Sequence, residues 1–420
     1  MNPRKPIIAI LALGLVAVLV LTFTPYALLH RARQAVAAVI HVEESPALDE
    51  TARQQPPPAP PFDVTGWYAG RGEDPARHGV LVQSCDGRQT FAEHNADTAF
   101  NPASLVKLST SLVALRRLGK DYRFETRVYV EGEPDKSGAL KGRLVVAGGD
   151  PTFGDVSAVL IAKKLEERGI KNVPEEIAVT PDFTFNFSGK PEESAERLAK
   201  VMKMTTKKWA IVEAPEGAPA FVVHSYPLSE ILLYMNAHSS NFVAERLGAL
   251  VGGPEGVRAY MVNELKLPAE QVALSTTSGL EINRLTPRGI VAVVRALEEE
   301  ARRHGLKIED IMAVASDDYG TLRKRLVGTP LESAVVGKTG TLVHDDGGMA
   351  SLGGVIYTQR AGKVCFVVLS QGSNVAERRS MTDQLLVEVV LTRDAPAHIL
   401  MPDKPRHMLE RDDLEITEDQ

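Results

Sequence analysis

The pattern of apolar and polar residues predicts a mixed α/β (α+β) chain whose first and last strands belong together. Residues 79–84 and 89–94 predict two strands joined by a turn at Asp86-Gly87. Residues 334–337, 352–357 and 364–369 predict three further strands, and residues 380–391 an apolar closing helix. The early and late strands can pair only if the chain folds back on itself. We therefore expect one mixed domain with an insertion in its middle.

The middle of the chain carries this insertion and then a helical region. A helix is predicted over residues 104–118, where Asn101-Pro102 opens it. Strand-like segments at 124–130, 144–147 and 177–180 alternate with helical segments at 156–168 and 192–204. They form an α/β block that reaches about residue 220. Four helical segments are predicted after it: 229–251, 256–265, 286–304 and 319–326.

The amino-terminal segment differs from that of a soluble protein. Residues 6–29 are uncharged, follow Arg4 and Lys5, and are long enough to cross a bilayer as a helix. No good small-x-small cleavage site follows, so an uncleaved anchor is favoured over a cleaved signal peptide. Prolines at 46, 56–58, 60 and 61 then predict a stiff, extended spacer.

These changes in composition and residue pattern predict the domain boundaries. In chain order they are a membrane anchor or uncleaved signal (1–30), a proline-rich linker (31–63), a discontinuous main domain (64–122 and 221–395), an inserted domain (123–220) and a disordered acidic tail (396–420).

Charge and cysteine content narrow the class of protein. The net charge is −6 and no long basic run occurs, so nothing supports a nucleic-acid partner. Cys85 and Cys365 are the only cysteines, which suits neither a disulfide scaffold nor a zinc site. Two buried free thiols are the simplest interpretation, whereas one disulfide would require an oxidising compartment.

The first chemical motif is Ser104-Leu105-Val106-Lys107, an S-x-x-K sequence at the start of a predicted helix. Positions i and i+3 share a helix face, so the Lys107 amine can reach the Ser104 hydroxyl. A serine needs a base to become a nucleophile, and a lysine can be that base when burial lowers its pKa. Taken alone, the same residues could be a helix-capping serine and a solvated lysine.

Two more motifs follow along the chain. Ser239-Ser240-Asn241 supplies a hydroxyl and an amide, although alone it would be an ordinary polar segment. The segment Gly337 to Thr341 contains K-T-G after a β-branched run, and alone it could be a surface loop. On a strand, Lys338 and Thr339 could grip a carboxylate, while Gly340 lets a substrate backbone approach closely.

The order S-x-x-K, S-x-N, K-T-G is that of penicillin-binding proteins and class A β-lactamases. The chain resembles the D-alanyl-D-alanine carboxypeptidase/endopeptidase family, the low-molecular-mass class C penicillin-binding proteins. Further segments carry this resemblance over about residues 75–375: 124–129, 144–151, 241–245, 278–280, 285–287 and 320–326. The block between S-x-x-K and S-x-N is shorter than in long members and has room for about one inserted domain.

The resemblance implies a penicillin-binding-protein/β-lactamase-like transpeptidase fold with an α/β domain inserted between S-x-x-K and S-x-N. It implies roles for eight residues: Ser104 as nucleophile, Lys107 as base, Ser239 as proton relay, Asn241 as amide-binding residue, and Lys338, Thr339, Gly340 and Thr341 as the substrate-binding strand. The backbone N–H groups of Ser104 and Thr341 would form the oxyanion hole. No metal or cofactor is implied.

The implied function is a serine-type D-Ala-D-Ala carboxypeptidase or endopeptidase acting on peptidoglycan peptides, with β-lactams as inhibitors. Two alternatives remain open at this point. A β-lactamase would share the motifs but needs a strong deacylating base, and a catalytically inactive peptidoglycan-binding scaffold would not need the intact motif residues. The implied location is extracytoplasmic, in the periplasm, with residues 6–29 in the inner membrane.

The shared fold also makes a prediction about the two cysteines. Cys85 ends the first strand of the main domain, and Cys365 begins the strand expected to run antiparallel to it. We therefore expect their Cα atoms within roughly 10 Å, about two strand spacings. A register slip of one residue would put the side chains on opposite faces, so a bond between them does not follow from proximity alone.

Overall fold

The protein is described by a computed structural model that covers residues 60–402, 406, 408–410 and 413–418. The predicted anchor at 6–29 and nearly all of the predicted linker lie outside these residues. Within them, no helix combines the length and the apolar character needed to cross a membrane.

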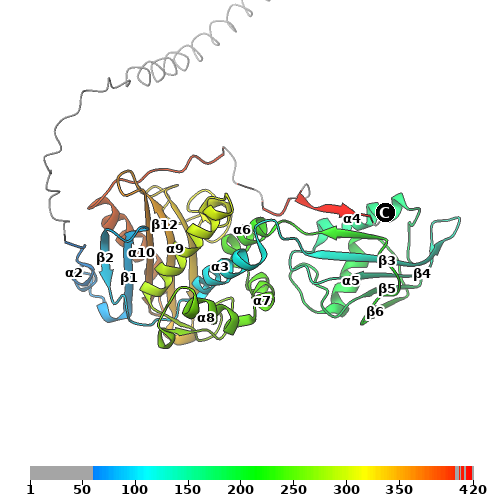
Figure 1. Ribbon diagram of the computed structural model, residues 1–420, viewed down its shortest axis with the longest axis horizontal. Helices are drawn as coiled ribbons and strands as arrows, with labels where there is room; N and C mark the ends of the chain where they lie inside the picture. The colour runs from blue at the N-terminus through cyan, green and yellow to red at the C-terminus, as the bar shows by residue number, and fades with distance from the viewer. Residues whose placement is uncertain (1–59, 403–405, 407, 411–412, 419–420) are drawn as a thin grey trace, which may run out of the picture. The chain divides into compact units, whose positions relative to one another are not determined.

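An antiparallel six-stranded sheet, in the order β10-β11-β12-β13-β1-β2, forms the centre of the main domain (Figure 1). Its strands are β1 (His78–Ser84), β2 (Thr90–His94), β10 (Ala313–Val314), β11 (Val335–Leu342), β12 (Met349–Tyr357) and β13 (Lys363–Gln371). The early strand β1 pairs with the late strand β13, which confirms that the chain folds back on itself.

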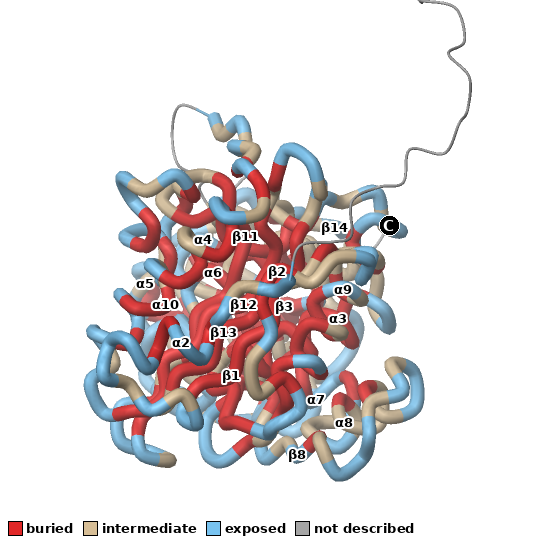
Figure 2. Tube along the Cα trace, turned by 90° about the vertical axis from the view of Figure 1, so that its left-hand side faces the viewer, coloured by how far each residue is buried: buried red, intermediate tan, exposed pale blue. Residues whose placement is uncertain are grey.

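Both faces of this sheet are covered, which explains why its central strands are almost continuously apolar. On β13, Cys365, Val367 and Leu369 pack into the core on the side of α3 (Val106–Leu118) and α9 (Pro287–Arg303). The alternate residues Val364, Phe366 and Val368 pack into the core on the side of α2 (Val64–Ala69) and α10 (Val375–Leu391). Figure 2 shows β1, β12 and β13 as a buried centre between these layers.

The helices of the main domain follow the predicted order with two differences, and α2 is an additional helix that was not predicted. They are α2 (Val64–Ala69), α3 (Val106–Leu118), α6 (Leu228–His238), α7 (Asn241–Leu250), α8 (Gly253–Asn263), α9 (Pro287–Arg303) and α10 (Val375–Leu391). Short 3₁₀ turns are η1 (Pro75–Arg77), η2 (Ala103–Leu105), η3 (Ala269–Gln271), η4 (Ile308–Asp310) and η5 (Asp345–Gly347), and β8 (Val272–Ala273) pairs with β9 (Arg284–Leu285).

The first difference is that the single helix predicted over 229–251 is broken into α6 and α7. Ser239 adopts a left-handed conformation (φ 57°, ψ 39°), and Ser240 caps α7 by accepting a hydrogen bond from the Val243 N–H at 3.3 Å. The serine side chain thus offers the backbone an alternative to a continuous helix.

The second difference is that residues 319–326, predicted to be helical, form turns. Gly320 has a φ of 121° and lies so close to α6 that an added Cβ would be 2.2 Å from the Ala237 carbonyl oxygen. The Thr321 N–H donates to the same oxygen at 2.9 Å. This segment is shaped by a contact with the end of α6, which local periodicity does not encode.

A second six-stranded sheet, in the order β14-β7-β3-β4-β5-β6, lies between α3 and α6 in the chain, except for β14. It contains β3 (Glu125–Pro134), β4 (Leu140–Ala147), β5 (Glu176–Val179), β6 (Lys208–Ile211), β7 (Phe221–His224) and β14 (Glu415–Thr417). Helices α4 (Asp155–Glu167) and α5 (Pro191–Val201) cover one face and connect the parallel strands β4, β5 and β6. Because β7 belongs to this sheet, the inserted block continues to His224 rather than ending at residue 220.

Two crossings connect this block to the main domain, and they are held side by side. The Phe124 N–H donates to the Ser225 hydroxyl at 2.9 Å, and the Ser225 N–H donates back to the Phe124 carbonyl at 2.9 Å. Further along, the Leu228 N–H donates to the Tyr122 carbonyl at 2.9 Å. The chain therefore leaves the main domain and returns to it at the same place.

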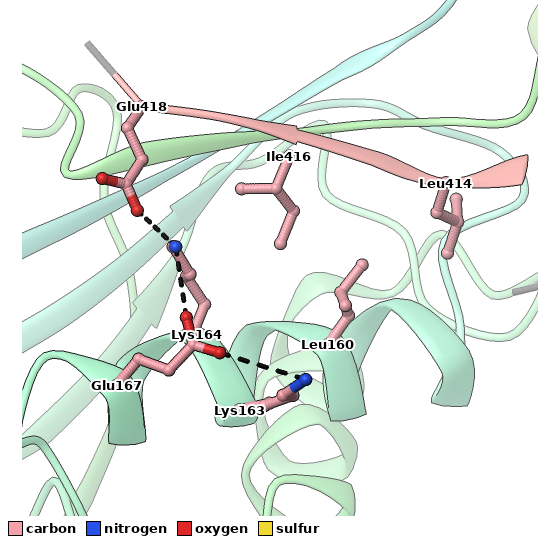
Figure 3. Close-up of a pocket in the computed structure, with 7 residues that line it drawn as sticks. All are labelled: Leu160, Lys163, Lys164, Glu167, Leu414, Ile416 and Glu418. Carbon is pink, nitrogen blue, oxygen red and sulfur yellow. Dashed lines mark hydrogen bonds and ion pairs between the residues drawn. The ribbon is translucent and has the colours of Figure 1, made fainter. Parts of the chain in front are cut away.

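The tail predicted to be disordered over 396–420 contains an ordered strand, so that prediction is wrong for Glu415–Thr417. β14 pairs antiparallel with β7, with Ile416 opposite Val223. Figure 3 shows Leu414 and Ile416 pointing toward Leu160 of α4, while Glu418 pairs with Lys164. Glu415 also pairs with Arg123 at 2.9 Å. Two of the acidic residues that suggested disorder, Glu415 and Glu418, therefore bind basic residues of the inserted block.

The two cysteines form a disulfide with a Cα–Cα distance of 4.9 Å. The predicted pairing of their strands and their proximity are confirmed, and the interpretation as free thiols is wrong. Cys365 lies opposite Gln83 on β1, and the Cys85 N–H donates to the Lys363 carbonyl at 2.8 Å just beyond the strand. The bond is a diagonal one across neighbouring strands.

Candidate active site

The site is built around Ser104, which lies in the 3₁₀ turn η2 immediately before α3. Ala103 before it adopts a left-handed conformation with a φ of 51°, which is rare for a residue with a side chain. The Asn101 side chain holds this turn, since its Oδ1 accepts a hydrogen bond from the Ala103 N–H at 3.1 Å. Its amide nitrogen donates to the Glu281 carbonyl at 3.1 Å.

Lys107 lies one turn further along and is fully buried. Its amine nitrogen is 3.0 Å from Ser104 Oγ, 2.7 Å from Asn241 Oδ1 and 2.5 Å from the Ser278 carbonyl oxygen. Burial lowers the pKa of Lys107 to about 7, although the negative charge of Glu245 opposes this shift. An amine with that pKa, within hydrogen-bonding distance of a serine hydroxyl, can accept the hydroxyl proton near neutral pH.

The break between α6 and α7 brings Asn241, the last residue of the second motif, to this position. Asn241 is the first residue of α7 and reaches Lys107 directly, while Ser239 occupies the left-handed end of α6 two residues earlier. A continuous helix would turn Ser239 and Asn241 about 200° apart around its axis. The serine-capped break therefore frees Ser239 and Asn241 from the opposite faces that a continuous helix would give them, and of the two it is Asn241 that contacts Lys107.

The third motif is the end of β11, which packs against the nucleophile turn. Gly340 approaches so closely that an added Cβ would be 2.8 Å from the Pro102 carbonyl oxygen and 2.1 Å from Ser351 Oγ. The Ser351 hydroxyl donates to the same Pro102 carbonyl at 2.9 Å. Only glycine fits here, and its absence of a side chain lets β11 lie directly beside Ser104.

Lys338 on the same strand is completely buried, and its amine donates to the Thr339 carbonyl at 2.6 Å. Burial, and to a smaller degree the neighbouring charge of Lys107, hold the pKa of Lys338 well below its ordinary value. The Thr339 hydroxyl donates to the Thr321 hydroxyl at 2.8 Å, and Thr341 Oγ1 accepts from Arg379 at 2.6 Å.

Three supporting residues were not identified from the sequence. Glu245 accepts hydrogen bonds from the Ser278 N–H at 2.9 Å and from the Thr277 hydroxyl at 2.8 Å, and so fixes the carbonyl that binds Lys107. Thr321 and Arg379 contact the two threonines of the K-T-G-T strand. Glu245 and Thr321 lie in segments that carried the family resemblance, but nothing in the local sequence indicated what they contact.

The loop after Thr277 closes the site from another side. Gly279 has a φ of 82°, and an added Cβ would be 2.0 Å from the Ala103 carbonyl oxygen. The loop therefore packs directly on the nucleophile turn, and it presents Leu280 and Ile282 to solvent. Within the residues that the structure describes, no group of three or more His, Cys, Asp or Glu side chains is arranged to hold a metal ion.

Comparison with known proteins places the chain in a family. The model of the D-Ala-D-Ala carboxypeptidase 3 (S13) family matches residues 71–192 and 193–390. The chain belongs to this family. It is 31% identical over 106 residues to a D-alanyl-D-alanine carboxypeptidase of Actinomadura sp. (strain R39), which is 24% of this chain and 20% of that protein.

A second relative matches over a longer stretch. The chain is 26% identical over 335 residues to carboxypeptidase Rv3627c of Mycobacterium tuberculosis, covering 74% of this chain and 66% of that protein. The chain thus spans less than two thirds of the length of either curated relative.

Solved structures share the fold across most of their length. A penicillin G-acylated predatory endopeptidase, Bd3459 of Bdellovibrio bacteriovorus, has a TM-score of 0.69 at 21% identity and covers 79% of this chain and 96% of its own. Penicillin-binding protein 4 of Haemophilus influenzae has a TM-score of 0.60 at 18% identity, with coverages of 74% and 96%. At these identities the likeness establishes the expected penicillin-binding-protein fold.

Proposed function

We propose that this chain is a serine-type D-Ala-D-Ala carboxypeptidase/DD-endopeptidase that acts on peptidoglycan stem peptides through an acyl-enzyme and is inhibited by penicillin. The observation that carries the proposal is the Lys107 amine, which bonds Ser104, Asn241 and the Ser278 carbonyl at once. Its pKa of about 7 suits a base at neutral pH. Membership of the S13 family supports the substrate class.

In the first half of the reaction, Ser104 Oγ attacks the carbonyl carbon of the scissile D-Ala amide while its proton passes to Lys107 Nζ. The negative charge on the carbonyl oxygen is stabilised by the backbone N–H groups of Ser104 and Thr341. As the carbon–nitrogen bond breaks, the Ser239 hydroxyl gives its proton to the leaving amine and takes the proton that Lys107 received, so that Lys107 is neutral again. Asn241 orients Lys107 and binds the substrate amide.

In the second half, water attacks the carbonyl carbon of the Ser104 ester and gives a proton to Lys107. As the bond between this carbon and Ser104 Oγ breaks, Lys107 returns the proton to Ser104 Oγ, which releases the shortened peptide and the free enzyme. No step draws on a metal or a cofactor. A β-lactam presents a strained amide to the same serine, and its ring-opened product blocks the site because the leaving group stays attached.

The test is a mass measurement after exposure to benzylpenicillin, with Ser137→Ala as a matched control on an exposed turn of the second sheet. We expect a stable adduct on Ser104 that Ser104→Ala abolishes and Ser137→Ala retains. Rapid turnover of penicillin would favour the β-lactamase alternative, and no adduct would favour the inactive scaffold. Assays on a pentapeptide and on a cross-linked dimer then separate carboxypeptidase from endopeptidase activity.

We also propose that residues 6–29 anchor the protein in the inner membrane with the catalytic part in the periplasm. The apolar run, the proline-rich spacer and the extracytoplasmic location of peptidoglycan support this. The Cys85–Cys365 disulfide suits an oxidising compartment. Full-length protein should resist carbonate extraction from membranes. Release by carbonate would contradict the anchor, and a mature amino terminus beyond residue 30 would show a cleaved signal instead.

A further inference from the structure

Arg379 lies in the second turn of α10 and reaches the end of the K-T-G-T strand. Its Nη2 donates to Thr341 Oγ1 at 2.6 Å. Thr341 directly follows Gly340, the residue that contacts the nucleophile turn. Arg379 is an exposed residue whose guanidinium is partly buried, so a ligand bound beside Thr341 can reach it.

The guanidinium of Arg379 differs from those of two neighbouring arginines in its ion pairing. Arg378 pairs with Glu73, and Arg325 makes a two-pronged pair with Asp383, with Nη2–Oδ1 at 2.6 Å and Nε–Oδ2 at 2.8 Å. For Arg379, by contrast, no acidic side chain lies within ion-pair distance among the described residues. Partial burial and the positive charge of Arg325 lower the pKa of Arg379, so a bound anion would stabilise its charged form.

The two lysines of the site are poorly suited to bind an anion, because neither is a stable cation at neutral pH. Lys107 is half deprotonated near neutral pH, since its pKa is about 7, and must be neutral to act as a base. Lys338 is fully buried, has a strongly lowered pKa and donates to its neighbour's carbonyl. An arginine, which keeps its proton at any physiological pH, is the stable cation at this end of the site.

The hydrogen bond from Arg379 also orients the hydroxyl of Thr341. Because Thr341 Oγ1 accepts from Arg379, its own hydroxyl proton remains available for a ligand. A donor that also accepts from a charged group is polarised and becomes a stronger donor. Arg379 and Thr341 together thus present a cation and an oriented O–H at the end of the K-T-G-T strand, next to the contact that Gly340 makes with the nucleophile turn.

We propose that Arg379, with the hydroxyl of Thr341, recognises the carboxylate next to the leaving amine of the substrate and makes the enzyme select peptides that end in a free D-amino-acid carboxylate. This inference rests on the proposed function and names the residue that determines its specificity. Arg379 is a specificity residue in this view, since it touches the substrate carboxylate and not the bond that breaks.

The test compares one D-Ala-D-Ala peptide that ends in a carboxylate with the same peptide ending in a carboxamide. We expect Arg379→Gln to lower kcat/KM for the carboxylate peptide by about tenfold to a hundredfold, the typical effect of losing a hydrogen bond to a charged group. The carboxamide peptide should be cleaved as slowly as before, so the selectivity collapses. Arg379→Lys should restore part of it because it keeps the charge.

Arg88→Gln is the matched control. Arg88 and Thr341 lie at opposite ends of the central sheet. Arg88 is in the turn after β1, which ends beside the start of β13, whereas Thr341 pairs with Ala350, and Ala350 pairs with Ser370 at the other end of β13. The Arg88→Gln variant should therefore cleave both peptides at the wild-type rates. Labelling by a fluorescent penicillin to full stoichiometry shows that each variant is folded with a competent Ser104.

Two results would overturn the inference while leaving the proposed function in place. One is an equal loss on both peptides in Arg379→Gln, which would assign Arg379 to positioning β11. The other is a wild-type enzyme that acylates but does not distinguish carboxylate from carboxamide. A wild-type protein that cleaves neither peptide and takes no penicillin label would instead refute the proposed function, and the inference with it.

Discussion

The contact between Lys107 and the loop fixed by Glu245 provides a direct test of how Ser104 is activated. Glu245 bonds the Ser278 N–H and the Thr277 hydroxyl, and its charge raises the pKa of Lys107 against the larger effect of burial. Changing Glu245 to glutamine removes the charge and keeps an oxygen for the Ser278 N–H. The pKa of Lys107 should therefore fall, and the pH at which acylation is half-maximal should fall with it.

The expected size of the pH effect follows from the pKa of about 7. Only neutral Lys107 can accept the Ser104 proton, so the acylation rate rises with pH. The neutral fraction increases from roughly a tenth at pH 6 to about a half at pH 7 and about nine-tenths at pH 8. The rate should thus rise about fivefold over the first interval and less than about twofold over the second. A lysine with an ordinary pKa would give about tenfold in each.

The assay is the initial rate of fluorescent-penicillin labelling between about pH 5.5 and pH 9, a range that spans both sides of that pKa. Wild type, Glu245→Gln and Glu255→Gln are compared. Glu255 is an exposed residue of α8 paired with Arg258 at 3.5 Å, and its loss should leave the profile unchanged. A rate that stays flat from pH 6 to pH 8 would refute Lys107 as the base, and a rate that still rises about tenfold per unit at pH 9 would refute its lowered pKa. An unchanged midpoint in Glu245→Gln would show that its charge does not act on Lys107.

Two further predictions concern stability. Replacing Cys85 and Cys365 by alanine should lower the free energy of unfolding by about 2–5 kcal/mol, since the bond closes a loop with a sequence separation of 280; identical urea transitions of the wild type with and without reductant would contradict this. Asp150 is fully buried, and burial raises its pKa to about 6. The folded state therefore binds this proton more tightly than the unfolded state, and its contribution to stability is complete below about pH 4 and is lost as the pH rises through 6. Asp150→Asn does not titrate, so relative to wild type it should gain about 2–3 kcal/mol between pH 4 and pH 8 in denaturant unfolding; an equal difference at both pH values would argue against a protonated Asp150.

Local sequence was sufficient where the physical cause is local. The buried strand β13 could be predicted because every residue from Val364 to Ser370 is buried. Ser104 and Lys107 could be identified because three residues of helix bring them together in any context. The K-T-G glycine was recognisable because close backbone approach favours glycine.

The remaining features depend on contacts between distant segments. Residues 319–326 have helical spacing, but Gly320 must accommodate the Ala237 carbonyl and leaves the helical region. From the sequence alone, Arg378 and Arg379 have the character of a solvated helix face. The contact of Arg379 with Thr341 of β11 is visible only in the folded structure. The strand β14 could not be predicted from its composition, since Glu415 and the adjoining Glu418 are stabilised by Arg123 and Lys164, which lie far earlier in the chain.

The paired crossings at Phe124 and Ser225 have a consequence for how proteins of this kind can vary. Since the two ends of the inserted block are hydrogen-bonded to each other, the main domain contains in effect a single closed loop at this position. The entropy of closing a loop grows only slowly with its length, by about 0.6 kcal/mol for each doubling. A block with additional strands, or with fewer, would join the main domain through the same pair of crossings. The size of the inserted block can therefore change in evolution, or in a chimaeric enzyme, while the separation between the two crossings, after α3 and before α6, stays the same.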